Sequence, residues 1–426
     1  MESIEEFRKQ AAAAPIVGPD APAELADKKE PGPIDRMAEA LANDPALADS
    51  IALNVGDHRI WIRGVLPWTG RYEQRPMDDV DRSHITARLQ TRWGLRTADN
   101  TVTHALNLHA ERNSFDPLVD LLDGLPQWDG TPRCGTLLHA YLGAEQGDYT
   151  EDAERLFFDA IVRRVYEPGC KFDYMLVLQG PQGIGKSTFL RYCAIEDTFF
   201  TDDVGSFGTR DFAQRLQGKT VIEVAELAAL RRADLEAVKR AITCASDQYR
   251  APYARDVKDY PRRCVLAGTT NASVYLADQT GNRRFLPIVC GVCEPTRSLH
   301  DDEEAAREDF RQAIAEAMES YAGGTAREKL VLGIGAEGAL AAQQAAQQED
   351  SRIGEIEEWL DSTTCYRVCA KQICVEALGI EKPKQYEINE VREIMRREFK
   401  EKWPENPKRQ KCDYGKHIVF ERRGAS

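Results

Sequence analysis

The chain has 426 residues, enough for two or three domains, and its 42% apolar content is that of an ordinary folded protein. Its formal net charge of −14 argues against a protein that coats nucleic acid with its whole surface, although one basic channel or domain remains compatible with it. No apolar run approaches the roughly 18 residues that a membrane span needs, and the acidic start MESIEEFRKQ is not a signal peptide. We therefore expect a cytoplasmic protein without membrane contact, whose 11 cysteines are reduced thiols.

Changes of composition along the chain predict five segments. Residues 1–50 are rich in Ala, Pro, Asp and Glu, which predicts a flexible acidic tail with a short helix at Ile34–Leu41. Residues 51–168 are typical of a mostly helical domain that follows a short pair of strands. Residues 169–300 alternate short apolar runs with helical segments, which predicts a largely parallel sheet inside an α/β domain. We expect an alanine-rich helical linker at 301–350 and a last small domain at 351–426.

The stretch YMLVLQGPQGIGKSTFL places a glycine-rich turn between an apolar strand and a helix. Its segment GPQGIGKS fits the pattern G-x-x-x-x-G-K-[ST] of a phosphate-binding loop, which predicts a P-loop NTPase. In such a loop backbone N–H groups face the phosphates, the lysine reaches the terminal phosphates and the next hydroxyl coordinates Mg²⁺. The loop alone does not distinguish ATP from GTP. The predicted nucleotide-binding residues are Gly180, Pro181, Gln182, Gly183, Ile184, Gly185, Lys186, Ser187 and Thr188.

Two acids lie within and just after the apolar run of KTVIEVAEL. A charge inside a buried strand is costly unless it is paired or bound to a metal, so Glu223 is predicted to be functional. Glu226 could instead begin the helix that follows. One acid would hold Mg²⁺ with Ser187 and the other would polarise the attacking water, and the sequence leaves the choice between them open.

Two further segments carry candidate catalytic residues. The strand CVLAGTTN ends in the polar residues Thr269, Thr270 and Asn271. A polar side chain here, with Asn271 as the candidate, can hold the attacking water or the terminal phosphate, although good turn formers also occupy such positions. In DQTGNRRFLPI, Arg283 or Arg284 is a candidate arginine finger, a guanidinium that stabilises charge during phosphoryl transfer. Adjacent arginines in a loop are more often a solvated surface. A finger from a neighbouring subunit would place the nucleotide at a subunit interface.

In this order, PGCKFDYMLVLQGPQGIGKST, VIEVAEL, YRAPYARDVKDYPRRCVLAGTTN and TGNRRFLPI, with LLDGLPQWDGTPRC upstream, resemble the virulence-associated protein E family. That family is similar to the superfamily 3 AAA+ helicases of phages and other mobile elements. The resemblance covers roughly residues 50–290 and implies an AAA+-like core, a homo-oligomeric ring that is usually a hexamer, and ATP-driven movement on DNA in a bacterial host cell.

The resemblance also implies a role for each candidate residue. Lys186 and Ser187 match the phosphate loop, Glu223 and Glu226 the acidic motif, Asn271 the sensor, and Arg283 or Arg284 the finger. Longer relatives carry a primase domain ahead of this core, and the first 50 residues are too short to hold one. We therefore expect priming from a separate primase or replication initiator.

The segment DQYRAPYARDVKDYPRR interleaves basic residues with three tyrosines, where similar helicases carry a hairpin that enters the pore of the ring. Basic residues neutralise phosphates, and tyrosines can stack on bases without reading sequence. The alternative is a solvated turn with the tyrosines packed beneath it. The predicted contacts with single-stranded DNA are Arg250, Tyr253, Arg255 and Lys258, and the same segment holds Tyr249, Tyr260, Arg262 and Arg263.

The last domain reverses the acidic balance of the chain, because Glu381–Gly424 contains 13 Lys and Arg against 9 Asp and Glu. Two helices followed by a hairpin around Tyr414 predict a winged-helix module, a fold that binds duplex DNA or another protein. The predicted contacts of its wing with DNA are Lys408, Arg409, Lys411 and Lys416.

Together these features predict a ring-forming, ATP-dependent DNA helicase or translocase for the replication of a phage or other mobile element, without a primase domain of its own. The alternative is an ATP-switched loader or origin-binding scaffold that binds DNA without processive unwinding. Stimulation of ATP hydrolysis by single-stranded DNA would distinguish the two.

Overall fold

The computed structural model describes residues 31–96, 98–230, 232–250, 256–273, 275–276, 281–324, 327–346, 352–412 and 414–423. The chain divides into two compact units, one of Met1–Tyr275 with Thr280–Ala346 and the other of Leu276–Gln279 with Gln347–Ser426. Within these described ranges, no helix combines the length and the apolar content that crossing a membrane requires.

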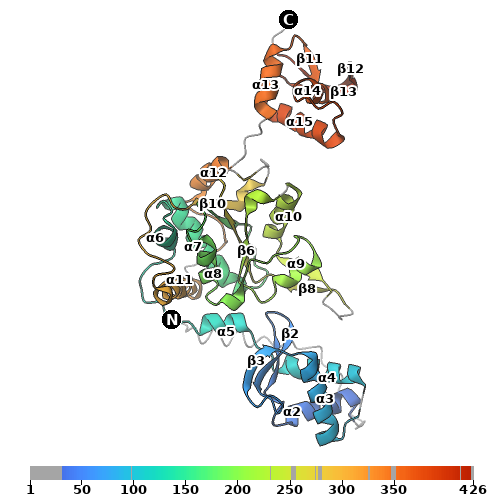
Figure 1. Cartoon of the computed structure of the whole chain (residues 1–426), viewed down its shortest axis with the longest axis vertical. Helices are drawn as coiled ribbons and strands as arrows, with labels where there is room; N and C mark the ends of the chain where they lie inside the picture. Colours follow the sequence, from blue (N-terminus) through green and yellow to red (C-terminus); the bar gives the residue numbers. More distant parts are fainter. Residues whose placement is uncertain are drawn as a thin grey trace. The chain divides into compact units, whose positions relative to one another are not determined.

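The amino-terminal part of the first unit packs three helices on a small antiparallel sheet (Figure 1, blue). Its core contains the buried side chains of Met37, Leu41 and Leu47. The short helix expected within the tail is present as Pro33–Asn43, and it buries an apolar face in this core, so the chain is folded and not a flexible tail from Pro33 onward. Residues 1–30 lie outside the described residues. The elements are α2 (Pro33–Asn43), β1 (Ile51–Asn54), β2 (Arg59–Val65), β3 (Tyr72–Pro76), α3 (Asp79–Trp93) and α4 (Asp99–Arg112).

The central part of the first unit is built on a parallel sheet of five strands in the order β10-β4-β9-β6-β5. This confirms the predicted α/β architecture. The apolar runs form strands because their side chains are buried on both faces, as in a sheet covered by helices on each side. The strands are β4 (Met175–Gln179), β5 (Phe200–Thr201), β6 (Val221–Val224), β9 (Val265–Thr270) and β10 (Phe285–Val289).

The helices that precede this sheet belong to it and not to an amino-terminal domain, which moves the boundary expected at residue 168. They are α5 (Pro117–Asp123), α6 (Leu137–Leu142) and α7 (Asp148–Tyr166), and their buried residues share one core with those of the sheet. The sheet is followed through the chain by α8 (Lys186–Cys193), α9 (Arg210–Arg215), α10 (Arg232–Thr243) and the two-stranded hairpin of β7 (Ser246–Tyr249) and β8 (Lys258–Pro261).

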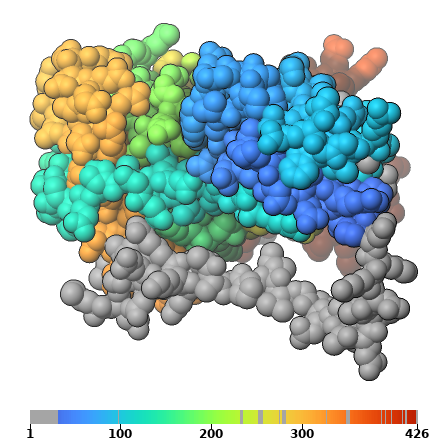
Figure 2. Space-filling model, turned by 90° about the horizontal axis from the view of Figure 1, so that it is seen from below, coloured from blue at the N-terminus to red at the C-terminus, as the bar shows by residue number. Residues whose placement is uncertain are grey.

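The segment expected as a helical linker is also part of this core. Helix α11 (Glu303–Ala322) inserts Phe310, which is fully buried and whose ring lies 4.9 Å from that of Phe189. Figure 2 shows the orange surface of this region directly against the teal surface of the preceding helices. Helix α12 (Ala336–Ala345) covers the edge strand β10, and its Gln343 donates a hydrogen bond to the Phe285 carbonyl at 2.8 Å. Both helices therefore stabilise the sheet.

The second unit has its own core and a three-stranded antiparallel sheet in the order β11-β13-β12 (Figure 1, orange to red). Two helices and a hairpin were predicted here, and all are present. The structure adds a leading helix and a short strand. In chain order the elements are α13 (Arg352–Ser362), β11 (Arg367–Cys369), α14 (Ala370–Glu376), α15 (Gln385–Glu398), β12 (Glu405–Cys412) and β13 (Gly415–Glu421).

Candidate functional site

The predicted phosphate loop connects the carboxyl end of β4 to the amino end of α8. Gly183 and Gly185 have φ of 84° and 94°, a left-handed conformation that favours glycine. Gly180 has no room for a side chain, because a Cβ there would lie 2.6 Å from the Cys290 carbonyl oxygen. These glycines permit a sharp turn from the strand into the amino terminus of α8, the kind of connection at which anions bind.

Lys186 begins α8 and turns back over the loop. Its ammonium group donates to the carbonyls of Gly180 and Pro181 at 2.7 and 2.6 Å, and to Asn271 Oδ1 at 3.0 Å. Burial lowers the pKa of this lysine. Asn271, which directly follows β9, is therefore brought into contact with the loop, as the sequence predicted. Phosphate oxygens in the loop would offer the ammonium group stronger acceptors than these neutral ones.

Glu223 lies on β6 with 1% of its surface exposed, and it links the loop to the sheet. Its Oε1 accepts hydrogen bonds from Ser187 Oγ and from Thr269 Oγ1, both at 2.7 Å. Its Oε2 is buried and has no hydrogen-bond partner among the described residues. A buried carboxylate oxygen without a partner is costly unless a ligand satisfies it. The arrangement therefore favours a bound cation beside Ser187.

Glu226 is exposed and follows β6 at a turn with left-handed backbone, φ 53° and ψ 46°. A residue with a side chain occupies this conformation only when its surroundings impose it. Leu227 supplies that constraint, because its buried side chain packs over Gly268 of β9, where a Cβ would lie 2.4 Å from the Leu227 Cδ1 atom. This contact between the turn and the sheet fixes the backbone that carries Glu226.

Arg283 and Arg284 lie at the opposite end of the sheet from the phosphate loop. They belong to the short 3-10 helix Asn282–Arg284 directly before β10, whose parallel register pairs Phe285 with Met175 and Val289 with Gln179. The length of β4 therefore separates them from the loop, a distance of about 13 Å at ~3.3 Å per residue. Neither arginine belongs to the group that the loop, Glu223 and Asn271 form within one chain.

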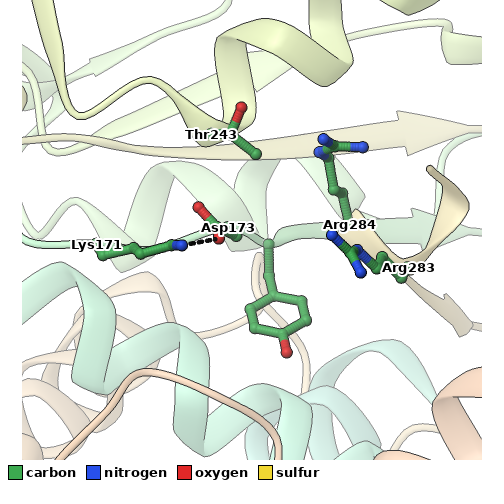
Figure 3. Close-up of a pocket in the computed structure, with 6 residues that line it drawn as sticks. Lys171, Asp173, Thr243, Arg283 and Arg284 are labelled. Carbon is green, nitrogen blue, oxygen red and sulfur yellow. Dashed lines mark ion pairs between the residues drawn. The ribbon is translucent and has the colours of Figure 1, made fainter.

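The two arginines line a cavity of about 450 Å³ at this amino end of the sheet (Figure 3). Arg283 is exposed, whereas Arg284 is half-buried and donates to the Gly281 carbonyl at 3.4 Å. The Arg284 Nε atom is buried without a partner among the described residues. Among the other lining residues, Lys171 pairs with Asp173 at 3.2 Å. Arg283 is thus the more exposed of the two guanidinium groups.

The hairpin β7–β8 places the basic-aromatic segment only in part as the sequence predicted. Arg250 and Lys258 are exposed where the two strands enter their connecting loop. Tyr249 and Tyr260 are buried and stacked on each other, with ring centroids 4.2 Å apart, so the structure corrects their expected availability to bases. The predicted contacts Tyr253 and Arg255 lie outside the described residues.

The two arginines that end this segment are also engaged within the protein. Arg262 is buried in an ion pair with Asp247 at 2.6 Å. Arg263 pairs with Asp116 at 2.7 Å and donates to the Val165 carbonyl at 2.9 Å. These side chains hold the base of the hairpin and are not available to bind DNA.

In the second unit the hairpin β12–β13 exposes Lys408, Lys411 and Lys416. Lys411 and Lys416 are direct partners in the antiparallel register. Two like charges opposite each other destabilise a hairpin, so a bound anion would relieve their repulsion. The side chain of Arg409, the fourth predicted contact, lies outside the described residues.

Sequence reasoning proposed Thr269 only as part of a polar strand end and missed the packing of Leu227 on Gly268. A glycine within the apolar strand VLAGTT was the available signal, because a strand glycine often marks a close approach of another group. The contact of Gly180 with the Cys290 carbonyl joins residues far apart in the chain, and no local pattern announces it.

The fold defines an α/β protein, and its parallel five-stranded sheet with helices is consistent with an NTPase-like core. The model of the virulence-associated protein E-like domain matches residues 122–352, more than half of the 426 residues, and the chain belongs to this family. The match confirms the resemblance read from the motifs. No curated protein sequence matches the chain.

Among solved structures, the chain is similar to the C-terminal region of NrS-1 in its apo state. One structure shares 14% identity over 92% of this chain and 99% of that one, with a TM-score of 0.45. Another, its A form, shares 12% identity over 87% and 96%, with a TM-score of 0.44.

Proposed function

We propose that this chain is the ATP-hydrolysing subunit of a ring-forming DNA helicase or translocase for the replication of a phage or other mobile element. The observation that carries the proposal is the Glu223 carboxylate, which accepts hydrogen bonds from Ser187 of the loop and Thr269 of β9. Three segments far apart in sequence meet around one buried acid, as hydrolysis of a metal-bound nucleotide requires.

The residues at this point fit a magnesium ion. Mg²⁺ prefers oxygen ligands and keeps several waters, and Ser187 with the unpartnered Glu223 Oε2 offers such ligands. When bound, the ion would neutralise part of the charge on the phosphates. Lys186 would donate to the terminal phosphates in place of the loop carbonyls. Because Glu223 contacts Ser187 and Glu226 does not, Glu223 is the proposed metal ligand, and Glu226 with Asn271 would orient the attacking water.

Assembly into a ring, with a hexamer as the expected size, is proposed from the position of the arginines. Arg283 lies at the end of the sheet opposite the phosphate loop, so it is too far away to stabilise the phosphates held by its own chain. A neighbouring copy that presents its loop to the cavity of Arg283 would gain this charge. The site is therefore incomplete within one chain.

We propose that the ring binds DNA and moves along it. The exposed Arg250 and Lys258 on the hairpin β7–β8 would contact a single strand, and the lysines of β12–β13 would contact duplex DNA. The element order of the second unit, with a three-stranded sheet that ends in a long hairpin, supports the proposal of a winged helix. We propose the cytoplasm of a bacterial host as the place where the ring acts.

The test is steady-state ATP hydrolysis with and without single-stranded DNA, with Lys186→Ala as the matched inactive control. We expect hydrolysis that DNA stimulates, and a loss on the order of 10²-fold or more in the variant. Normal turnover by Lys186→Ala would contradict the ATPase. Hydrolysis indifferent to DNA would instead favour the loader or scaffold, in which ATP acts as a switch.

A further inference from the structure

A second hollow, of about 240 Å³, lies beside the base of the hairpin β7–β8 in the first unit. Its walls come from α9 with the turn before it, from α10 and from β7, together with Arg262 directly after β8. Phe212 and Tyr249 are buried among its lining residues and give it a rigid aromatic floor. Two of its lining residues, Tyr249 and Arg262, belong to the basic-aromatic segment, but neither was among the predicted DNA contacts, and the phosphate loop contributes nothing to the hollow.

The charged groups deep in the hollow already pair with each other. Arg262 donates to both oxygens of Asp247, at 2.6 and 2.8 Å, and also to the Ala241 carbonyl. Its guanidinium lies over the ring of Phe212, 5.8 Å from the centroid. The floor is therefore neutral and held in place by its own contacts.

The rim of the hollow carries two cations whose charge is not offset. Arg210 and Arg240 are exposed, and neither guanidinium group makes a hydrogen bond or ion pair with any residue that the structure describes. The nearby acids on the same helices already pair with other side chains, since Asp211 binds Arg215 at 3.0 Å and Glu236 binds Lys239 at 2.8 Å. In a chain of net charge −14, two unmatched arginines on one rim favour an anionic ligand.

We infer that this rim binds the sugar–phosphate backbone of single-stranded DNA that runs alongside the hairpin. Tyr249 lines the hollow, directly precedes the exposed Arg250, and pairs in register with Lys258, so rim and hairpin share one continuous surface. Guanidinium groups suit phosphate oxygens because they donate two parallel hydrogen bonds. The inference rests on the proposed function and extends its binding of single-stranded DNA to Arg210 and Arg240.

The test compares the full-length protein with an Arg210→Ala/Arg240→Ala variant in binding a fluorescent oligothymidine by anisotropy, over a series of salt concentrations. Each phosphate contact on a single strand contributes roughly 0.7 to the slope of log K against log salt, so the double variant should lose about 1.4. Arg215→Ala, on the same helix but outside the hollow, is the matched control and should keep the slope. Arg210→Lys/Arg240→Lys should recover most of it, because it restores the charge. Thermal unfolding verifies that each variant is folded.

The outcomes separate this inference from the proposed function. If the wild-type protein binds oligothymidine and the double variant binds it with the same affinity and slope, the rim does not contact DNA. If the double variant instead loses binding of polyglutamate while DNA binding is unchanged, the rim recognises an acidic protein segment, which also overturns the inference. If the wild-type protein fails to bind oligothymidine at all, both the proposed binding of single-stranded DNA and the assignment of the rim to it are wrong.

Discussion

Glu223 and Glu226 differ in their surroundings more than their chemical identity suggests. Glu223 is buried in a strand and contacts Ser187, whereas Glu226 is exposed on a turn with left-handed backbone. Different surroundings assign different tasks to two identical side chains, because one can hold a cation out of water while the other meets a water molecule.

Substituting each acid separately tests this division. Glu223→Gln should lower ATP hydrolysis on the order of 10²-fold and raise the Mg²⁺ concentration that gives half-maximal activity, because it removes the negative charge from the metal ligands. Glu226→Gln should slow hydrolysis while leaving the Mg²⁺ dependence unchanged. Titration of activity with Mg²⁺ measures both effects, and the reverse pattern would exchange the two roles.

Among the elements, the turn after β6 packs against β9 through the close approach of Leu227 to Gly268. Gly268→Ala would place a Cβ 2.4 Å from Leu227 Cδ1 and 2.9 Å from Met175 Cε, both in the core. Such overpacking costs about 1–3 kcal/mol and should displace the turn that carries Glu226. We expect kcat to fall while the dissociation constant for ATP changes little.

The matched control for this contact is the double variant Gly268→Ala/Leu227→Ala, which removes the clash by shortening the leucine. It should recover part of the lost kcat. Equal kcat values for the wild-type protein and Gly268→Ala would show that the contact does not position Glu226.

The junction of α6 and α7 predicts a pH dependence of stability. Glu154 of α7 is fully buried and accepts hydrogen bonds from the backbone N–H groups of Leu137 and Leu138, at 2.9 and 3.0 Å. Burial raises its pKa from 4.5 to about 8, although these N–H donors lower it. As pH rises between these two values the unfolded chain loses a proton that the folded chain keeps, so the folded state loses stability across that window.

Glu154→Gln cannot titrate, so its free energy of unfolding should lose this part of the pH dependence. Urea unfolding of both proteins at several pH values from 5 to 8 measures the difference. Identical slopes would mean that Glu154 does not change its protonation on folding in this range.

At the scale of the whole molecule, the separation of Arg283 from the phosphate loop predicts complementation between defective copies. Lys186→Ala lacks the phosphate contact and Arg283→Ala lacks the guanidinium, so each alone should be inactive. Mixed assemblies should regain some hydrolysis, because a loop from one variant can face an arginine from the other. Activity measured against the mixing ratio should peak at intermediate mixtures. A flat, inactive profile would argue that Arg283 does not act between subunits, and Arg284→Ala in its place tests the second arginine.

The loop and Glu223 could be predicted because their patterns are local: glycines at fixed spacing, and a charge inside an apolar strand. The positions of α11 and α12 could not be predicted, because an alanine-rich helix shows the same residue pattern whether it lies on the surface or packs against a sheet. The buried contact of Phe310 with Phe189 places α11 in the core, and these two residues lie far apart in sequence. The burial of Tyr249 and Tyr260 could not be predicted from the sequence either, because tyrosine occurs both in packed hairpins and on surfaces that stack on bases.

The placement of Arg283 before β10, with the loop after β4, also bears on inheritance. If each copy completes the reaction of the next, an inactive copy disables its own site and deprives its neighbour. A cell that makes both forms would then lose far more activity than the share of inactive protein, so the defect would be dominant. A mobile element that encodes such a copy could suppress an active relative in the same cell simply by joining its rings.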